Sequence, residues 1–265
     1  MAETRRNRYD ALIEEVFFAN YKAGDAEVCF DRSEFSAVAR RLGIAVPKNL
    51  GDIVYSYRYR AELPPRIVAL LAEGQEWVIR PAGPGKYVFA KTTAARFVPN
   101  PSMSYIKVLD ATPEIIRRYA LNDEQALLAI LRYNRLIDVF LGITCYPLQS
   151  HLRTTVQGMG QTETDEMYVG LNRRGQHFVI PVQVKSSSGE VGVVQIEQDL
   201  GVCESKFPGL ICRPVGAQFM GEEMIALFEF GMCDSEIRVM DERHYRLVPN
   251  KELSDAELRK YNQIR

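Results

Sequence analysis

The chain has 265 residues, 46% of them hydrophobic and 25% charged, a composition that suits one large or two small globular domains. Its net charge of −1 excludes a protein that holds nucleic acid through a basic field over its whole surface. Residues 1–100 carry 15 basic and 12 acidic side chains against 18 and 22 in the rest, so any positive patch is expected early in the chain.

Helical patterns followed by a hairpin pattern occupy this first part. Asp31 or Ser33 can cap a helix that Gly43 ends, and Asn49 can cap the next one. We expect helices over 8–21, up to 42 and over 50–60, a short helix from 64, and strands over 76–80 and 86–89. Helices followed by a β-hairpin are the order of a winged helix-turn-helix, which is therefore predicted for residues 1–98.

A segment rich in proline, asparagine and serine, 96–104, marks the predicted domain boundary. Beyond it, Pro113 begins a short helix, and Asn122 with Gln125 forms a capping box for a longer helix that Gly142 ends. Strands are expected over 151–156, 164–172 and 176–185, a helix over 193–206, and strands over 210–219, 224–230 and 236–240. The second domain, 99–265, is thus predicted as α-β-β-β-α-β with extra C-terminal strands, within an α+β or α/β chain.

The most informative stretch, 162–185, contains two apolar-rich strands around a turn. A three-residue hairpin loop that ends at Gly175, with this glycine in the left-handed conformation, fixes the pairing register. Counting back from the loop, Asp165 lies opposite Gln183, and Lys185 lies two residues further on the same face. The sequence therefore predicts an acid, an amide and an amine on one surface patch.

These three groups suit the hydrolysis of phosphodiesters. A carboxylate binds Mg²⁺, which keeps several waters and takes few protein ligands. Bound metal polarises phosphoryl oxygens and supplies hydroxide near neutral pH. A neighbouring ammonium group orients the attacking water or stabilises the charge that develops.

Two short segments resemble the motifs of the PD-(D/E)xK nuclease superfamily, which includes many restriction endonucleases and Holliday-junction resolvases. Thr162-Glu-Thr-Asp165 is similar to the first-acid segment, and Gln183-Val-Lys185 to the second. Gln183 stands where the second acid is usual, as in the Mrr-like branch. The resemblance covers about residues 120–220, and the superfamily core is α-β-β-β-α-β.

The resemblance implies a catalytic site of Asp165, Gln183 and Lys185. In this interpretation Asp165 and the carbonyl of Val184 bind Mg²⁺, for which Mn²⁺ can substitute, and Gln183 offers a neutral and weaker oxygen ligand. Lys185 serves the nucleophile. Glu163 and Glu124 are the candidates for supplying the missing charge, and the polar segment 195–198 can face either the site or solvent.

The segment 48–60 contains basic and amide side chains, which recognition helices present to the major groove. The alternative is that Tyr55 and Tyr59 pack in the core while the arginines are solvated. The expected DNA contacts are Lys48, Asn49, Arg58, Arg60, Arg80 and Lys86. The Gly-Pro-Gly turn before Lys86 is no phosphate-binding P-loop, because Arg80 stands where the first glycine is needed.

The sequence thus predicts a Mg²⁺-dependent, sequence-specific endonuclease of restriction type that acts on double-stranded DNA, and cutting both strands favours a homodimer. A DNA-binding regulator with a degenerate nuclease fold is the alternative that Gln183 favours. RNA or branched DNA is a third hypothesis for the substrate. The absence of a long apolar run, a signal-like segment and zinc-type cysteine spacing predicts a cytoplasmic protein with reduced thiols and no membrane partner.

Overall fold

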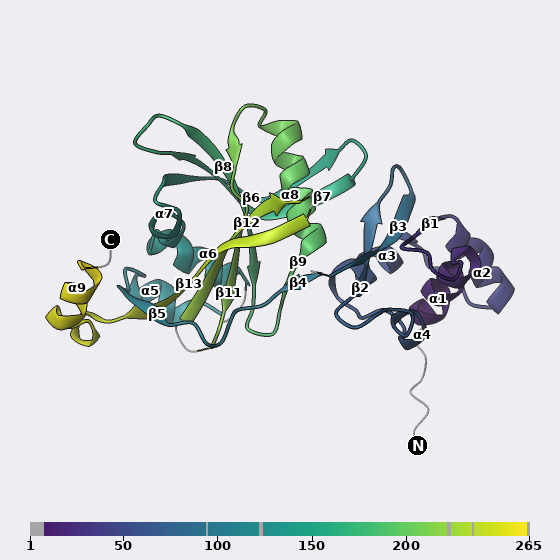
Figure 1. Ribbon diagram of the computed structural model, residues 1–265, viewed down its shortest axis with the longest axis horizontal. Helices are drawn as coiled ribbons and strands as arrows, with labels where there is room; N and C mark the ends of the chain where they lie inside the picture. The colour runs from purple at the N-terminus through teal and green to yellow at the C-terminus, as the bar shows by residue number, and fades with distance from the viewer. Residues whose placement is uncertain (1–7, 94, 122–123, 222–223, 235, 264–265) are drawn as a thin grey trace, which may run out of the picture. The chain divides into compact units, whose positions relative to one another are not determined.

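A computed structural model describes residues 8–93, 95–121, 124–221, 224–234 and 236–263 (Figure 1). The chain divides into two compact units, one comprising the chain up to Ala95 together with 155–162, the other comprising 96–154 and the chain from Glu163. The sequence predicts this division after residue 98 and does not predict that residues 155–162 belong to the first unit. Both units combine helices with strands, and the second contains a large mixed sheet, so the protein belongs to the α+β class. None of the described helices is long and apolar enough to cross a membrane.

The first unit packs helices against a three-stranded antiparallel sheet in which β3 lies between β1 and β2. Its elements are α1 (Arg8–Asn20), β1 (Glu27–Asp31), α2 (Glu34–Leu42), α3 (Gly51–Tyr59), α4 (Pro65–Val68), β2 (Glu76–Pro81) and β3 (Lys86–Thr92). Gly43 ends α2 with φ 67°, as expected of a glycine at this position. Strand β1 is not predicted from the sequence, because its five residues are too few for a clear alternating pattern and only Val28 and Phe30 are buried.

The core of the first unit forms around the apolar side of α1. Phe17 is fully buried, and its ring lies 5.3 Å from that of Trp77 and 5.0 Å from that of Phe89. The predicted stripe of α1 therefore packs directly on β2 and β3.

The second unit is built on a sheet with strand order β5-β13-β12-β11-β8-β7-β6, and β10 pairs with β8 beside this path. Its helices are α5 (Glu114–Tyr119), α6 (Glu124–Tyr133), α7 (Leu136–Leu141), α8 (Val193–Lys206), the 3₁₀ turn η1 (Asn250–Glu252) and α9 (Asp255–Tyr261). Its long strands are β6 (Thr144–Val156), β7 (Gly160–Leu171), β8 (His177–Lys185), β12 (Met224–Cys233) and β13 (Glu236–Val248). Its short strands are β4 (Arg96–Phe97), β5 (Tyr105–Leu109), β9 (Val191–Gly192), β10 (Ile211–Cys212) and β11 (Val215–Phe219), and β4 pairs with β9.

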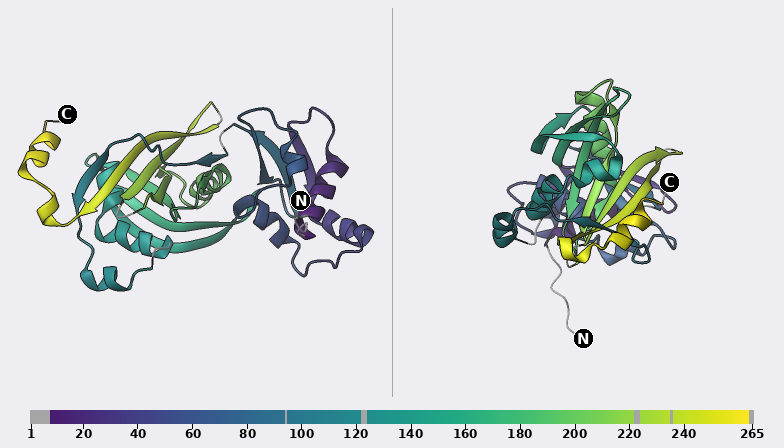
Figure 2. Two further views of the ribbon diagram at one scale, coloured as in Figure 1. Left: turned by 90° about the horizontal axis from the view of Figure 1, so that it is seen from below. Right: turned by 90° about the vertical axis from the view of Figure 1, so that its left-hand side faces the viewer.

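The sheet of the second unit is covered on both faces. Strand β11 runs parallel to β8 after the crossover through α8, whereas β7 runs antiparallel to β8. Figure 2 shows α8 end-on within the curve of the sheet, with α6 and α7 on its outer side. The main core forms between α6, α7 and the inward residues of β8, β11 and β12.

Several predicted boundaries in this unit need correction. The helix predicted to run without a break to Gly142 is wrong, because it divides into α6 and α7 at Arg135, which has φ 49°. The predicted capping residue Asn122 lies outside the described residues. The strand expected over 210–219 divides into β10 and β11, and the strand expected over 236–240 continues to Val248.

Asn134 explains where α6 ends. This buried side chain accepts a hydrogen bond from the backbone N–H of Ala111 at 2.7 Å and donates one to Oγ1 of Thr112 at 2.8 Å. Because its amide is committed to the segment that precedes α5, the chain turns here, and Arg135 adopts the left-handed conformation.

The turn between β7 and β8 has the expected geometry. Gly175 has φ 74° and donates its N–H to the carbonyl of Asn172. The strand pairs run from Leu171 opposite His177 to Glu166 opposite Val182, a register that continues to Asp165 opposite Gln183.

Replacing Asn134 tests its role at the break between α6 and α7. We expect Asn134→Ala to lower the free energy of unfolding by about 2 kcal/mol, because buried partners lose their hydrogen bonds. Urea unfolding followed by circular dichroism measures this change. The matched control Asn262→Ala, at an exposed helix end, should stay within about 0.5 kcal/mol of wild type. Equal stability of the two variants would contradict the assignment.

Candidate functional site

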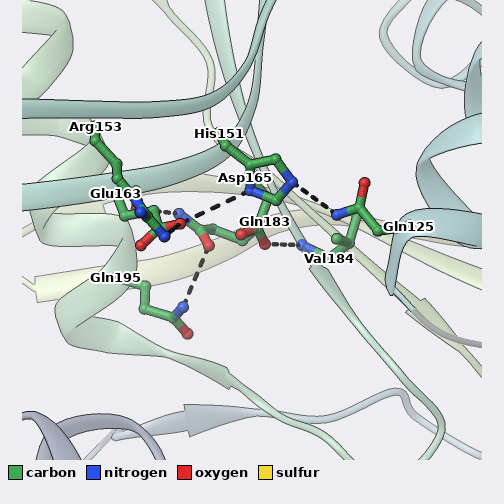
Figure 3. Close-up of polar contacts among 8 residues, drawn as sticks. All are labelled: Gln125, His151, Arg153, Glu163, Asp165, Gln183, Val184 and Gln195. Carbon is green, nitrogen blue, oxygen red and sulfur yellow. Dashed lines mark hydrogen bonds and ion pairs between the residues drawn. The ribbon is translucent and has the colours of Figure 1, made fainter.

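Asp165 lies on β7 where the strand pairs with the end of β8. One of its carboxylate oxygens accepts a hydrogen bond from the backbone N–H of Val184 at 2.9 Å (Figure 3). Among the described residues, no hydrogen bond engages the other oxygen. Burial raises the pKa of Asp165, and the Val184 N–H and the ammonium of Lys185 oppose this shift. The structure thus offers a half-buried carboxylate with one oxygen available to a ligand.

Lys185 is the last residue of β8 and is largely buried, with 16% of its side chain exposed. Its ammonium nitrogen lies 3.7 Å from Oε1 of Glu124, at the start of α6. Three charged groups from β7, β8 and α6 therefore gather at one end of the strand pair, and Lys185 acts electrostatically on Asp165.

Gln183 is only 1% exposed and faces α8, so the expectation that it lies on a surface patch is wrong. The alternation of side chains along β8 explains this, because Val182 and Val184 fill the core beneath α6 and α7 and leave Gln183 to the opposite face. Its Nε2 donates to Oδ2 of Asp199 at 2.9 Å and contacts the carbonyl of Glu163 at 3.4 Å.

The orientation of the Gln183 amide follows from these partners. A carboxylate and a carbonyl both accept hydrogen bonds, so the NH₂ group must face them. The Oε1 atom of Gln183 is left to accept a hydrogen bond from Nε2 of Gln195 on α8, at 3.2 Å (Figure 3). In this arrangement the amide oxygen is not presented to Asp165.

Asp199 on α8 is a site residue that the sequence analysis missed. It is fully buried, with Oδ1 accepting from Oγ1 of Thr164 at 2.6 Å and Oδ2 accepting from Gln183. Thr164, Asp199, Gln183 and Gln195 form one connected set, which we call the Asp199 network. Burial raises the pKa of Asp199 to about 7, and the nearby charge of Asp165 acts in the same direction while Lys185 acts against it. One signal for this network was present in the sequence, since Gln195 and Asp199 are spaced by four and share a helix face.

His151 and Glu163 lie beside Asp165. His151 has φ 48° and lies with its Nε2 2.9 Å from Nε2 of Gln125 (Figure 3). Glu163 accepts a hydrogen bond from Arg153 at 3.0 Å, and its Oε1 is 3.8 Å from Nδ1 of His151. Glu163 and Glu124, the two candidates for the missing charge, are therefore both engaged with basic groups.

The donor set of the site fits Mg²⁺ better than a metal that needs a closed cage. Among the residues described, no three His, Cys, Asp or Glu side chains are grouped to hold a metal ion. Mg²⁺ is usually held by one or two carboxylates and keeps several waters, and one available oxygen of Asp165 meets this need.

The expected DNA contacts lie on the first unit, around α3 and the β2–β3 hairpin. Lys48 and Asn49 are exposed just before α3, where Asn49 accepts a hydrogen bond from the N–H of Gly51. Lys86 is exposed at the start of β3, and Arg80 is half-buried on β2.

Helix α3 turns its tyrosines in two directions. Tyr57 is buried and donates a hydrogen bond to Asp10. Tyr55 is 44% exposed, which contradicts the alternative that it packs in the core. Arg60 lies over the Tyr55 ring and Arg58 over the Tyr59 ring, each with its guanidinium carbon 4.9 Å from the centroid.

Comparison with known proteins gives one short match. A stretch of 72 residues is 40% identical to N-acetyl-D-glucosamine kinase of Erwinia tasmaniensis. The match covers 27% of this chain and 23% of the kinase, so the chain spans less than a quarter of that protein's length. No protein-family profile matches the chain, and no solved structure gives a significant match.

The raised pKa of Asp199 predicts a pH dependence of stability. The folded protein holds this proton up to about pH 7, whereas a free aspartate loses it near pH 3.8. The stability that this group contributes is therefore complete below about pH 4 and is lost as the pH rises through 7. Between pH 5 and pH 8 the loss should be about 2 kcal/mol.

The Asp199→Asn variant isolates this contribution, because the other titrating groups are common to both proteins. Urea unfolding at pH 5 and pH 8 should show the variant gaining stability relative to wild type at the higher pH. A difference between the two proteins that is the same at both pH values would contradict the prediction.

Proposed function

We propose that this protein is a Mg²⁺-dependent DNA endonuclease of the PD-(D/E)xK type. The observation that carries the proposal is the carboxylate of Asp165, which has one available oxygen and lies within the electrostatic influence of Lys185. A carboxylate beside an ammonium group at the end of two paired strands provides both a metal ligand and a cation for a phosphodiester.

The order of elements in the second unit supports this assignment. Helices α6 and α7 precede the consecutive strands β6, β7 and β8, and α8 then leads to β11, which is parallel to β8. Apart from the short strands β9 and β10, this order agrees with the α-β-β-β-α-β core expected from the resemblance, and β12 and β13 extend the sheet.

Each residue of the site has a distinct proposed role. Asp165 and the carbonyl of Val184 hold Mg²⁺, which when bound polarises the phosphoryl oxygens and activates water. Lys185 orients the nucleophile and stabilises the charge that develops on the phosphate. Gln183, whose oxygen is taken by Gln195, orients the site instead of binding the metal directly.

The first unit is proposed to bind double-stranded DNA as a winged helix. Its order α1-β1-α2-α3-α4-β2-β3, with β3 central in the sheet, supports the proposal that α3 is the recognition helix and the β2–β3 hairpin is the wing. Arg60, held over the exposed ring of Tyr55, and Arg58, half-buried over the half-buried ring of Tyr59, are the basic groups of α3 that we propose for phosphate contacts. Lys48, Asn49, Arg80 and Lys86 extend this surface.

The biological role that we propose is a restriction-type enzyme that cuts specific sequences in the cytoplasm. Cutting both strands at one site favours a homodimer. The five cysteines are free thiols, which is in keeping with a reducing compartment.

Plasmid cleavage tests the proposed nuclease site. In Mg²⁺ we expect wild type to produce discrete fragments, and EDTA should abolish them. Asp165→Asn and Lys185→Ala should each lower the cleavage rate at least about 100-fold, because each removes charge from the reacting centre. Asp255→Asn, an exposed change on α9, is the matched control and should cleave as wild type does.

The pattern of failure separates the competing functions. Intact DNA binding without cleavage in Mg²⁺ or Mn²⁺ would replace the nuclease with a non-catalytic DNA-binding regulator. Cleavage of RNA or branched DNA in preference to a linear duplex would keep the chemistry and change the substrate.

Salt dependence of binding tests the DNA surface of the first unit. We expect the double variant Arg58→Ala/Arg60→Ala to weaken duplex binding and to reduce the slope of log affinity against log salt by about 1 to 2, since each lost phosphate contact removes about 0.9. Fluorescence anisotropy at several salt concentrations measures the slope. Arg259→Ala, exposed on α9, is the control. An unchanged slope in the double variant would remove α3 from the proposed interface.

A further inference from the structure

Asp199 is the one acid of this site that is completely removed from water and paired with no cation among the described residues. Glu124 is near Lys185, and Glu163 is bonded to Arg153. Asp199 instead receives two neutral donors, the hydroxyl of Thr164 and the amide of Gln183. A buried carboxylate without a cation is costly, so its presence requires a reason beyond packing.

We propose that Asp199 supplies, from helix α8, the negative charge that Gln183 does not carry on strand β8, and that it acts as a positioning residue through Gln183. This inference rests on the proposed nuclease function and deepens it. The charge sits directly behind the position at which the superfamily motif places its second acid, joined to that position by a hydrogen bond of 2.9 Å. Its effect on a cation at Asp165 is electrostatic, in a buried setting where such effects are strong.

The amide of Gln183 and the carboxylate of Asp199 are complementary as hydrogen-bond donor and acceptor. A glutamate at 183 would place its carboxylate against Asp199 and against the carbonyl of Glu163, both of which are acceptors. Only a donor fits at 183 while Asp199 is ionised. The charge is therefore fixed on α8, and the amide links it to β8.

Hydrogen bonding alone does not require an acid at position 199. An asparagine there could accept from Gln183 through Oδ1, and the hydroxyl of Thr164 could rotate to accept from Nδ2. The Asp199→Asn variant therefore removes the charge with little change of shape, and Thr164→Val removes one hydrogen bond while keeping the charge.

An exchange of charge between the two positions tests the inference. The double variant Gln183→Glu/Asp199→Asn moves the carboxylate from α8 to β8, where the amide introduced on α8 can donate a hydrogen bond to it. At pH 8, above the pKa of Asp199 of about 7, the full chain and its variants are titrated with Mn²⁺ by calorimetry in the absence of DNA. The kcat and KM for plasmid cleavage in Mg²⁺ are measured separately at the same pH. Circular dichroism confirms that each variant is folded.

We expect Asp199→Asn to weaken Mn²⁺ binding by about 10- to 100-fold and to lower kcat while KM for DNA is unchanged, as for other outer groups of metal sites. The double variant should recover most of both losses, and Thr164→Val should lose less than Asp199→Asn. Gln183→Glu alone should be less stable than wild type at pH 8, because two adjacent carboxylates repel each other.

Two results would overturn the inference. Wild-type Mn²⁺ affinity in Asp199→Asn would show that the charge is not used, and a double variant no better than Asp199→Asn would show that Asp199 is only structural. If wild type still cleaves DNA in these cases, the nuclease function stands without this role of Asp199. If wild type neither binds Mn²⁺ nor cleaves, the proposed function fails, and the inference fails with it.

Discussion

Strand β8 is buried along nearly its whole length, and its pairing with β7 constrains everything around it. Successive side chains must point to opposite faces, so the valines at 182 and 184 enter the core beneath α6 and α7, and Gln183 enters the space below α8. A polar side chain placed there has to find partners inside the protein. The Asp199 network supplies these partners, and it lies close enough to Asp165 and Lys185 for both to act electrostatically on Asp199.

Two carboxyl groups are buried on opposite faces of this sheet, and they differ in the charge of their hydrogen-bond partners. Glu166, on the α6 face, is bonded to Arg132 at 2.6 Å and to the hydroxyl of Tyr168, so its charge is neutralised by a neighbouring helix. Asp199, on the α8 face, has only neutral donors among the described residues. The first arrangement joins a helix to the sheet. The second keeps a buried carboxyl group close to Asp165 with no cation bonded to it among the described residues, and burial raises its pKa to about 7. A perturbed acid of this kind is typical of functional sites and is costly for a purely structural core once it ionises.

In the first unit, the tyrosines of α3 likewise differ in burial and in role. Tyr57 faces inward and fixes α3 to α1 through Asp10, whereas Tyr55 is exposed with Arg60 over its ring, and Tyr59 is half-buried with Arg58 over its ring. The inward tyrosine positions the helix, and the exposed pair of Tyr55 and Arg60 gives the helix a basic group at its surface. Such a surface can contact phosphates without a net positive charge on the whole protein.

The sequence by itself determined the features that depend on interactions between residues close together in the chain. The turn at Gly175 set the register of β7 and β8, the apolar spacing gave α8 its bounds, and the register placed Asp165 opposite Gln183. Only the tertiary structure decided that α8 covers the face of β8 on which Gln183 lies, and which side chains Gln183 meets there. Its partner Asp199 is 16 residues away on a helix, and the contact of Asp199 with Thr164 spans 35 residues. Local periodicity carries no information about such contacts, because they form only when a helix and a sheet pack together; the end of α6 at Asn134 was missed for the same reason.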